Sequence, residues 1–303
     1  TLIPLIRSID KVLQSWIGRR QLIVCVGDHS APELLETIQN QVLKHPHLAF
    51  LLPEEISGRG MSIRAIMEIC KHLDSNLLLF SANMATEAGP SIGDNWLESL
   101  LTPVQGHYDL VVGSLRRHLG SDSIAHMMAA PMLETFYGFR ISDPLGGIYA
   151  ISHDFIEELA HEASFWGEII KGYGIDFWLL TRALSWNKNI CEVNMGGIII
   201  NHDLERRNRI FKDIASTIFA AIRRDSAIWL QDRLVIKVAD ILARSEINQP
   251  DIIGYSLEEL LENFRSGCNR YGHIFDTSNV KENLQDIMQL TEDDFYLDDD
   301  LWV

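Results

Sequence analysis

The strongest constraint on the fold is an alternation of short β-rich runs with amphipathic stretches from the start of the chain to about residue 200. The β-rich runs predict strands at residues 2–6, 21–26, 49–52, 76–80, 110–113, 147–151 and 189–193. The stretches between them predict helices at residues 9–16, 32–43, 62–73, 124–136, 155–160 and 175–185. This alternation is typical of a mostly parallel sheet covered by helices, in which ligands bind at the carboxyl ends of the strands.

The pattern changes after His202. Apolar residues recur at helical spacing from Leu204 to about Leu242, a further helical stretch follows at residues 257–264, and no strand is expected there. We therefore predict an α/β domain at residues 1–203 and a helical C-terminal extension at residues 204–303. The extension ends in an acidic tail, DDFYLDDDLWV, which predicts a mobile or loosely docked terminus. Its amphipathic helices could also supply the surface of a homodimer.

Composition narrows the class of protein. A formal charge of -16 would repel a phosphate backbone, so a nucleic-acid partner is not expected. The four cysteines form no CxxC pair, which argues against a zinc cluster or a disulfide framework and fits a reducing cytoplasm. The longest apolar runs fall far short of the roughly 20 residues that a membrane helix needs. The first residues do not have the form of a secretory signal, so we expect a cytoplasmic protein without a membrane span.

Two predicted loops carry groups suited to an anionic ligand. Gly58, Arg59 and Gly60 precede a helix, where backbone N–H groups and a cation could hold a diphosphate. The same loop could be a glycine turn with a surface arginine. Ser81 and Asn83 end a buried strand, and their neutral oxygens would hold Mg²⁺ less strongly than paired aspartates. Asn83 is either a weak metal ligand or a residue that closes the turn.

Further loops carry carboxylate, histidine and arginine side chains. Residues 143–147 (DPLGG) lead into a strand. Asp176 stands near a helix start, where it is either a first-turn carboxylate favoured by the helix dipole or a residue that faces the hydroxyls of a sugar. His202 ends a short strand at residues 194–202 and is either a metal ligand or a surface or packed residue. The basic cluster at residues 116–118, with the polar residues 120–123 after it, either binds a small carboxylate or phosphate or forms a solvated loop.

Taken in order, these segments resemble the retaining GT-A glycosyltransferases that make mannosylglycerate and glucosyl-3-phosphoglycerate. LIVCVGD is similar to the second strand of that family, and SGRGMSIRA is similar to its glycine-lysine-glycine loop before a helix. DPLGGIYAIS resembles the family's proline-leucine-glycine segment, and GYGIDFWLL resembles its acidic helix start. The histidine of NMGGIIINH falls at the family's metal-ligand histidine. The resemblance covers roughly residues 1–230.

The resemblance implies a Rossmann-like GT-A domain that transfers a hexose, with retention, from a GDP- or UDP-sugar to a small polar acceptor such as glycerate or phosphoglycerate. It implies that Asp176 and Leu145 lie at the reacting centre, and that His202 and Asn83 hold a divalent cation, Mg²⁺ or Mn²⁺. The implied nucleotide-sugar site consists of Pro4, Gly27, Asp28, Gly58, Arg59, Gly60, Ser81, Asn83, Gly146 and Gly147. The implied acceptor site consists of Arg116, Arg117, Ser121, Asp122 and Ser123.

The chain departs from the family at the metal-binding aspartate pair, which reads Ser81 and Asn83, and at the loop lysine, which is Arg59. These departures motivate an alternative: a catalytically weak glycosyltransferase-like protein that binds a nucleotide, a sugar or a protein partner without turnover. A nucleotidyltransferase of similar fold is a third hypothesis.

Overall fold

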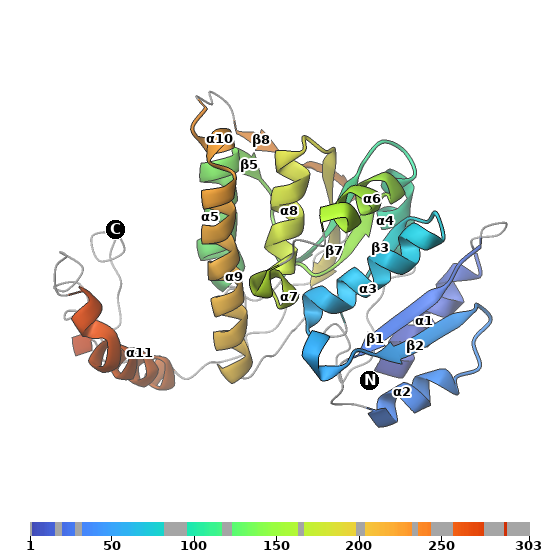
Figure 1. Ribbon diagram of the computed structural model, residues 1–303, viewed down its shortest axis with the longest axis horizontal. Helices are drawn as coiled ribbons and strands as arrows, with labels where there is room; N and C mark the ends of the chain where they lie inside the picture. The colour runs from blue at the N-terminus through green and yellow to red at the C-terminus, as the bar shows by residue number, and fades with distance from the viewer. Residues whose placement is uncertain are drawn as a thin grey trace. The chain divides into compact units, whose positions relative to one another are not determined.

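The computed structural model of the chain describes residues 2–15, 20–27, 32–81, 96–116, 123–162, 167–197, 204–231, 236–243, 257–275 and 288–289. Its contacts divide the chain into two units, Thr1–Asp251 and Ile252–Val303. The first unit holds the sheets, and the second holds helix α11 (Leu257–Tyr271) with a 3-10 turn at Gly272–Phe275 (Figure 1). Across these described segments, no helix is both long and apolar enough to cross a membrane.

The centre of the first unit is a mixed, mostly parallel sheet. Within the described residues its strands lie in the order β3-β6-β4-β7-β9. They are β3 (Leu77–Leu79), β6 (Tyr149–Ile151), β4 (Leu110–Arg116), β7 (Ile190–Gly197) and β9 (Asp240–Ala243). Strand β6 is antiparallel to β3 and β4, while β4 and β9 each pair in parallel with β7. Smaller parallel pairs join β1 (Ile23–Gly27) to β2 (His47–Leu51), and β5 (Phe139–Arg140) to β8 (Lys237–Val238). The predicted α/β class is confirmed.

Helices pack on both faces of the central sheet and on the β1–β2 pair. The helices of the first unit include α1 (Leu2–Leu13), α2 (Pro32–Gln39), α3 (Arg59–His72), α4 (Trp96–Val104), α5 (Ala130–Met132), α6 (His153–Glu162), α7 (Glu168–Lys171), α8 (Ile175–Ser185), α9 (Leu204–Arg224) and α10 (Ser226–Trp229). Of these, α1 and α2 pack on the β1–β2 pair. Wider π-helical turns, Ile124–Ala129 and Leu133–Tyr137, flank α5. Pro131 accounts for the widening of the first of these turns, because it lacks an N–H and its ring crowds the preceding turn. The helices predicted from residue 32 to residue 185 are confirmed, with shifted ends.

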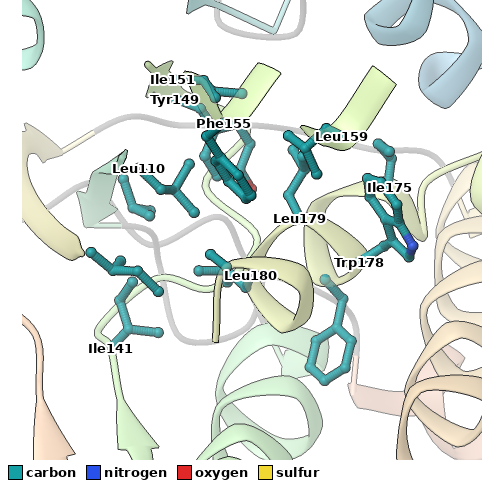
Figure 2. Close-up of a cluster of buried hydrophobic side chains, with 14 of the residues drawn as sticks. Leu110, Ile141, Tyr149, Ile151, Phe155, Leu159, Ile175, Trp178, Leu179 and Leu180 are labelled. Atoms are coloured by element: carbon teal, nitrogen blue, oxygen red, sulfur yellow. The ribbon is translucent and has the colours of Figure 1, made fainter. Parts of the chain in front are cut away.

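Successive side chains of the central strands enter different cores, because side chains alternate between the faces of a sheet. Leu110 of β4 and Tyr149 of β6 belong to the larger core, together with Phe155 of α6 and Trp178 of α8. Figure 2 shows these side chains gathered beside α8. Val111 is one residue further along β4 and packs in a second core on α4. Burial on both faces explains why these strands read as continuous apolar runs in the sequence.

The strand predicted at residues 2–6 is wrong, because this segment is the first part of helix α1. Leu2, Ile6, Ile9 and Leu13 recur at helical spacing and pack in a third core with the β1–β2 pair. Pro4 does not interrupt the helix, since it stands in the first turn, where a backbone N–H has no intrahelical partner. The helix predicted at residues 9–16 is the continuation of the same element.

The prediction that no strand follows residue 204 is also wrong. Strand β9 pairs in parallel with β7, and its first residue, Asp240, lies opposite Cys191. Ile241 and Leu242 of β9 remain 46% exposed, so the strand has the weak apolar signal of a sheet edge. Because β9 belongs to the sheet, the first unit runs past the boundary predicted after residue 203. The helical stretch predicted at residues 257–264 is confirmed as part of α11.

Asp10 ties α1 to the segment before β2 and provides a test of pH dependence. Its carboxylate accepts hydrogen bonds from the backbone N–H groups of Lys44 and His45, and its Oδ1 lies 2.8 Å from Nδ1 of His45. Burial works to raise the pKa of Asp10, but the hydrogen bonds from His45 and Lys44 outweigh it and lower this pKa. The stability that Asp10 contributes is therefore complete above the ordinary pKa of an aspartate and is lost as the pH falls through the lowered value.

We expect Asp10→Ala to lower the free energy of unfolding by about 1–3 kcal/mol at pH 7, because two backbone N–H groups lose their acceptor. Urea unfolding of the wild type and the variant at pH 7 and near pH 3 measures the difference. This difference should shrink at the lower pH. An equal difference at both pH values would show that the charge of Asp10 plays no part.

Candidate functional site

The candidate site lies at the edge of the sheet where strands β3, β4 and β7 end. These strands point to the same edge, because β6 is antiparallel to both β3 and β4 and because β7 is parallel to β4. Ser81 follows β3, and Gly147 precedes β6 at this edge. Two helix starts supply the charged groups: Arg59 is the first residue of α3, and Asp176 is the second residue of α8. Distant parts of the sequence thus meet where ligands bind in α/β sheets.

Arg59 and Asp176 form a two-point ion pair. Arg59 donates from Nε to Oδ2 of Asp176 at 3.0 Å and from Nη2 to Oδ1 at 2.9 Å. Its Nη1 donates to the hydroxyl of Ser81 at 3.2 Å. The side chains of Arg59 and Asp176 are only 17% and 8% exposed. Burial works to lower the pKa of Arg59, but the charge and hydrogen bonds of Asp176 outweigh it and raise this pKa. The pair therefore fixes a cation and a carboxylate side by side at the strand ends.

Gly147 lies against this pair. Its φ of +73° is left-handed, and a Cβ at this position would lie 3.1 Å from Nη2 of Arg59 and 3.4 Å from Cβ of Ser81. Glycine is favoured here because it adopts positive φ without strain and leaves room for the guanidinium. The structure thus brings together four of the predicted site residues: Arg59, Ser81, Gly147 and Asp176.

The loop that carries Leu145 and Gly146 is fixed by the buried carboxylate of Asp143. This side chain accepts a hydrogen bond from the backbone N–H of Leu115 at 3.1 Å and another from Leu145 at 3.3 Å. A Cβ on Gly146 would lie 2.5 Å from the carbonyl oxygen of Gly113. Leu145 itself packs against the larger core. The sequence predicted the loop but not that Asp143 holds it in place. The feature that could have indicated this role is an acidic residue before a proline in an otherwise apolar segment.

Tyr149 is a residue of this site that sequence reasoning missed. It is fully buried, and its hydroxyl has no hydrogen-bond partner of ordinary geometry among the described residues. Burial raises its pKa well above the usual value, and the negative charge of nearby Asp176 raises it further. The sequence feature that could have identified it is a single tyrosine within an apolar strand. Tyr149 is two residues before Ile151, so both side chains lie on the same face of the strand and in the same core.

Gly58 and Gly60 pack closely against the backbone of α7. Gly58 has a φ of +128°, and a Cβ there would lie 2.6 Å from the carbonyl oxygen of Lys171. A Cβ on Gly60 would overlap the carbonyl oxygen of Ile170. Close helix packing therefore accounts for both glycines, whereas the sequence associated them with the approach of an anion. Their part in donor binding stays a prediction.

Several other predicted site residues are placed only in part. Arg116 pairs with Gly197 near the ends of β4 and β7, and only its backbone is described. Ser123 precedes a π-helical turn, Gly27 ends β1, and Pro4 lies on α1. The remaining predicted residues lie outside the described part of the chain: Asp28, Asn83, Arg117, Ser121, Asp122 and His202. The roles assigned to all of these residues stay predictions.

The described side chains do not by themselves fit a divalent cation. In the part of the chain that the structure covers, no group of three or more histidine, cysteine, aspartate or glutamate residues could hold a metal ion. Asp176 is the carboxylate beside Ser81, and both of its oxygens accept hydrogen bonds from Arg59. The predicted ligands Asn83 and His202 lie outside the described residues. No step of the chemistry is therefore derived through a metal.

No protein-family model and no curated protein matches the chain. Among solved structures, the chain is similar to glucosyl-3-phosphoglycerate synthase from Mycobacterium tuberculosis in complex with Mn²⁺, UDP and phosphoglyceric acid. The identity is 14%, the match covers 71% of this chain and 72% of that chain, and the TM-score is 0.48. The complex of the same enzyme with Mg²⁺ and UDP matches at 14% identity over 71% and 73% of the two chains, with a TM-score of 0.48. The complex with Mn²⁺ and UDP-glucose matches at 14% identity over 70% and 82%, with a TM-score of 0.45. This enzyme is one of those that the ordered motifs of the sequence resemble.

Proposed function

We propose that the chain is a glycosyltransferase that moves a hexose, with retention, from a nucleoside diphosphate sugar to a small polar acceptor such as glycerate or phosphoglycerate. The observation that carries the proposal is the meeting of Arg59, Ser81, Gly147 and Asp176 at the carboxyl edge of the parallel strands. These residues belong to separate motifs whose order along the chain resembles that family. A fixed cation next to a fixed carboxylate suits a ligand that has an anionic part and a hydroxyl-rich part.

In this proposal Arg59 neutralises charge on the diphosphate. The departing diphosphate gains negative charge as the bond to the sugar breaks, and a fixed positive group stabilises that change. Arg59 stands at the N-terminus of the 14-residue helix α3, whose dipole favours an anion at the same end. Asp176 accepts hydrogen bonds from sugar hydroxyls, and the floor of the site is formed by Leu145, Gly146 and Gly147.

The acceptor and cation parts of the proposal rest on the sequence. Arg116 and Arg117, with Ser121, Asp122 and Ser123, follow β4 and would hold the carboxylate or phosphate of the acceptor. Asn83 and His202 would contribute to a site for Mg²⁺ or Mn²⁺, and a bound cation would supply further positive charge to the diphosphate.

The direct test incubates the purified chain with UDP- and GDP-sugars, glycerate or 3-phosphoglycerate, with and without Mn²⁺, and detects products by mass spectrometry. We expect transfer to at least one acceptor, and we expect Asp176→Asn to lower kcat/KM by about a hundredfold or more, because the sugar loses its orienting carboxylate. The control is Asp240→Asn, which changes a carboxylate at the opposite end of the sheet, where β9 begins. It should retain activity. Absence of both transfer and donor hydrolysis across the panel would refute the proposal.

A second candidate is a glycosyltransferase-like protein that binds a nucleotide, a sugar or a protein partner without turnover. Two observations favour this candidate. Ser81 stands where the family has a metal-binding acid, and Arg59 is already hydrogen-bonded to Asp176 and Ser81. Calorimetry with nucleoside diphosphates separates the two functions: binding that Mn²⁺ strengthens and that His202→Ala abolishes favours the enzyme, and binding indifferent to metal favours the second candidate. Release of pyrophosphate from a nucleoside triphosphate would instead favour the nucleotidyltransferase.

A further inference from the structure

The hydroxyl of Tyr149 has no well-formed hydrogen bond to a described residue in the ligand-free protein. The ring is fully buried in the larger core. Its hydroxyl lies near enough to Asp176 for a hydrogen-bonding contact to raise its pKa, but it makes no hydrogen bond of full geometry to a described residue. A buried polar group without a partner is unfavourable, and phenylalanine would fill the same space without this penalty. Tyrosine at this position therefore suggests that the hydroxyl forms a better hydrogen bond in another state of the protein.

The groups around this hydroxyl identify that partner. The charges that act on Tyr149 belong to Asp176, Arg59 and Asp143. Asp143 already accepts hydrogen bonds from the backbone of Leu115 and Leu145. Both oxygens of Asp176 are bound by Arg59. The hydroxyl of Tyr149 therefore lies next to a carboxylate that a single competing donor now engages.

The proposed function gives Arg59 two partners. Its Nε and Nη2 now face Asp176, and a diphosphate would use the same planar arrangement of N–H groups. If Arg59 turns to the diphosphate, Asp176 loses both hydrogen bonds while it remains 8% exposed. An ionised carboxylate in such a place is strongly destabilised unless another donor replaces the lost one.

We propose that Tyr149 is a positioning residue for Asp176: its buried hydroxyl donates to the Asp176 carboxylate when Arg59 turns from Asp176 to the diphosphate of the donor. This inference rests on the proposed function. The exchange keeps Asp176 ionised and directed at the sugar while Arg59 holds the diphosphate, so that donor binding itself prepares the carboxylate.

A double-mutant cycle on diphosphate binding tests the exchange. Calorimetry measures the affinity for UDP, GDP and inorganic pyrophosphate in the wild type, Tyr149→Phe, Asp176→Asn and the double variant. Asp176→Asn should bind about tenfold more tightly, because Arg59 no longer has to leave a charged partner. Tyr149→Phe should bind about tenfold more weakly when Asp176 is intact and should have no effect when position 176 carries asparagine. A purely structural role would weaken binding equally in both backgrounds.

Tyr137→Phe is the matched control, because Tyr137 is also buried but donates to Asp225 at 2.6 Å. It should lower the melting temperature and leave diphosphate affinity unchanged, whereas Tyr149→Phe should leave the melting temperature of the ligand-free protein unchanged or higher. If Asp176→Asn does not fold, the ¹⁵N resonance of Nε in Arg59, assigned by its loss in Arg59→Lys, reports the exchange in the wild type. It should shift when UDP is added, and an unchanged resonance at saturating UDP would overturn the inference.

The outcomes separate this inference from the proposed function. No binding of any diphosphate by the wild type would refute the proposed function and the exchange with it. Binding by the wild type, with equal effects of Tyr149→Phe in the two backgrounds, would refute the exchange alone.

Discussion

Replacement of Asp225 by alanine is expected to lower the free energy of unfolding by about 3–5 kcal/mol, because it removes the carboxylate that is hydrogen-bonded to the buried Arg182. Nη2 of Arg182 donates to both oxygens of Asp225, at 2.6 and 2.9 Å. Arg224 donates to the same two oxygens at 2.8 and 2.7 Å, and Tyr137 donates to Oδ2 at 2.6 Å. The side chain of Arg182 is only 6% exposed, so water cannot replace the lost partner. Its other carboxylate contact, from Nη1 to Oε1 of Glu162, is longer, at 3.6 Å.

The charge of Asp225 also gives this effect a pH dependence. Burial works to raise the pKa of Asp225, but hydrogen bonds from Arg224, Tyr137 and Arg182 outweigh it and lower this pKa. The stabilisation is therefore complete above the ordinary pKa of an aspartate and is lost as the pH falls through the lowered value.

Urea unfolding at pH 7 measures the loss, and Glu134→Ala is the control. Glu134 also accepts two hydrogen bonds from an arginine, Arg140, but these side chains are 30% and 58% exposed. We expect no measurable change in that control, because solvent screens exposed pairs. Equal losses in the two variants would show that burial does not set the strength of the Asp225 cluster.

Replacement of Gly60 by alanine is expected to lower the free energy of unfolding by about 3 kcal/mol. Alanine is ordinarily the better helix former by about 1 kcal/mol, so the expected sign is opposite to that of helix propensity. The reason is contact between backbones: the added Cβ would overlap the carbonyl oxygen of Ile170, and neither α3 nor α7 can move without disturbing the other. Because Arg59 is the preceding residue, the affinity for UDP should fall as well.

Gly267→Ala is the matched control, since Gly267 also lies in a helix, α11, and a Cβ there meets no atom within 4 Å. It should leave stability unchanged or raise it. Thermal unfolding and calorimetry with UDP check both variants. Gly60→Ala with unchanged stability would show that α3 and α7 separate more readily than their packing indicates.

Local pattern was sufficient for much of the fold. The apolar runs at residues 76–80 and 110–113 predicted strands because both faces of the sheet are buried, and the helical spacing at residues 175–185 predicted α8. Local pattern failed at residues 2–6, where a short apolar run fits a strand or a helix equally well. It failed again at β9, whose short and half-exposed edge carries little periodic signal.

By itself, the sequence determined the α/β class, the order of the motifs and the presence of Arg59, Ser81, Gly147 and Asp176 at element ends, since these follow from periodicity and turn chemistry over short stretches. Only the tertiary structure decided that Arg59 pairs with Asp176, which is 117 residues away in the sequence, and that the hydroxyl of Tyr149 is buried beside them. Only the tertiary structure showed that the close approach of α7 requires glycine at position 60. The physical reason is that hydrogen-bond and packing partners are chosen by proximity in space, which the folded sheet sets and which no short segment of the chain encodes.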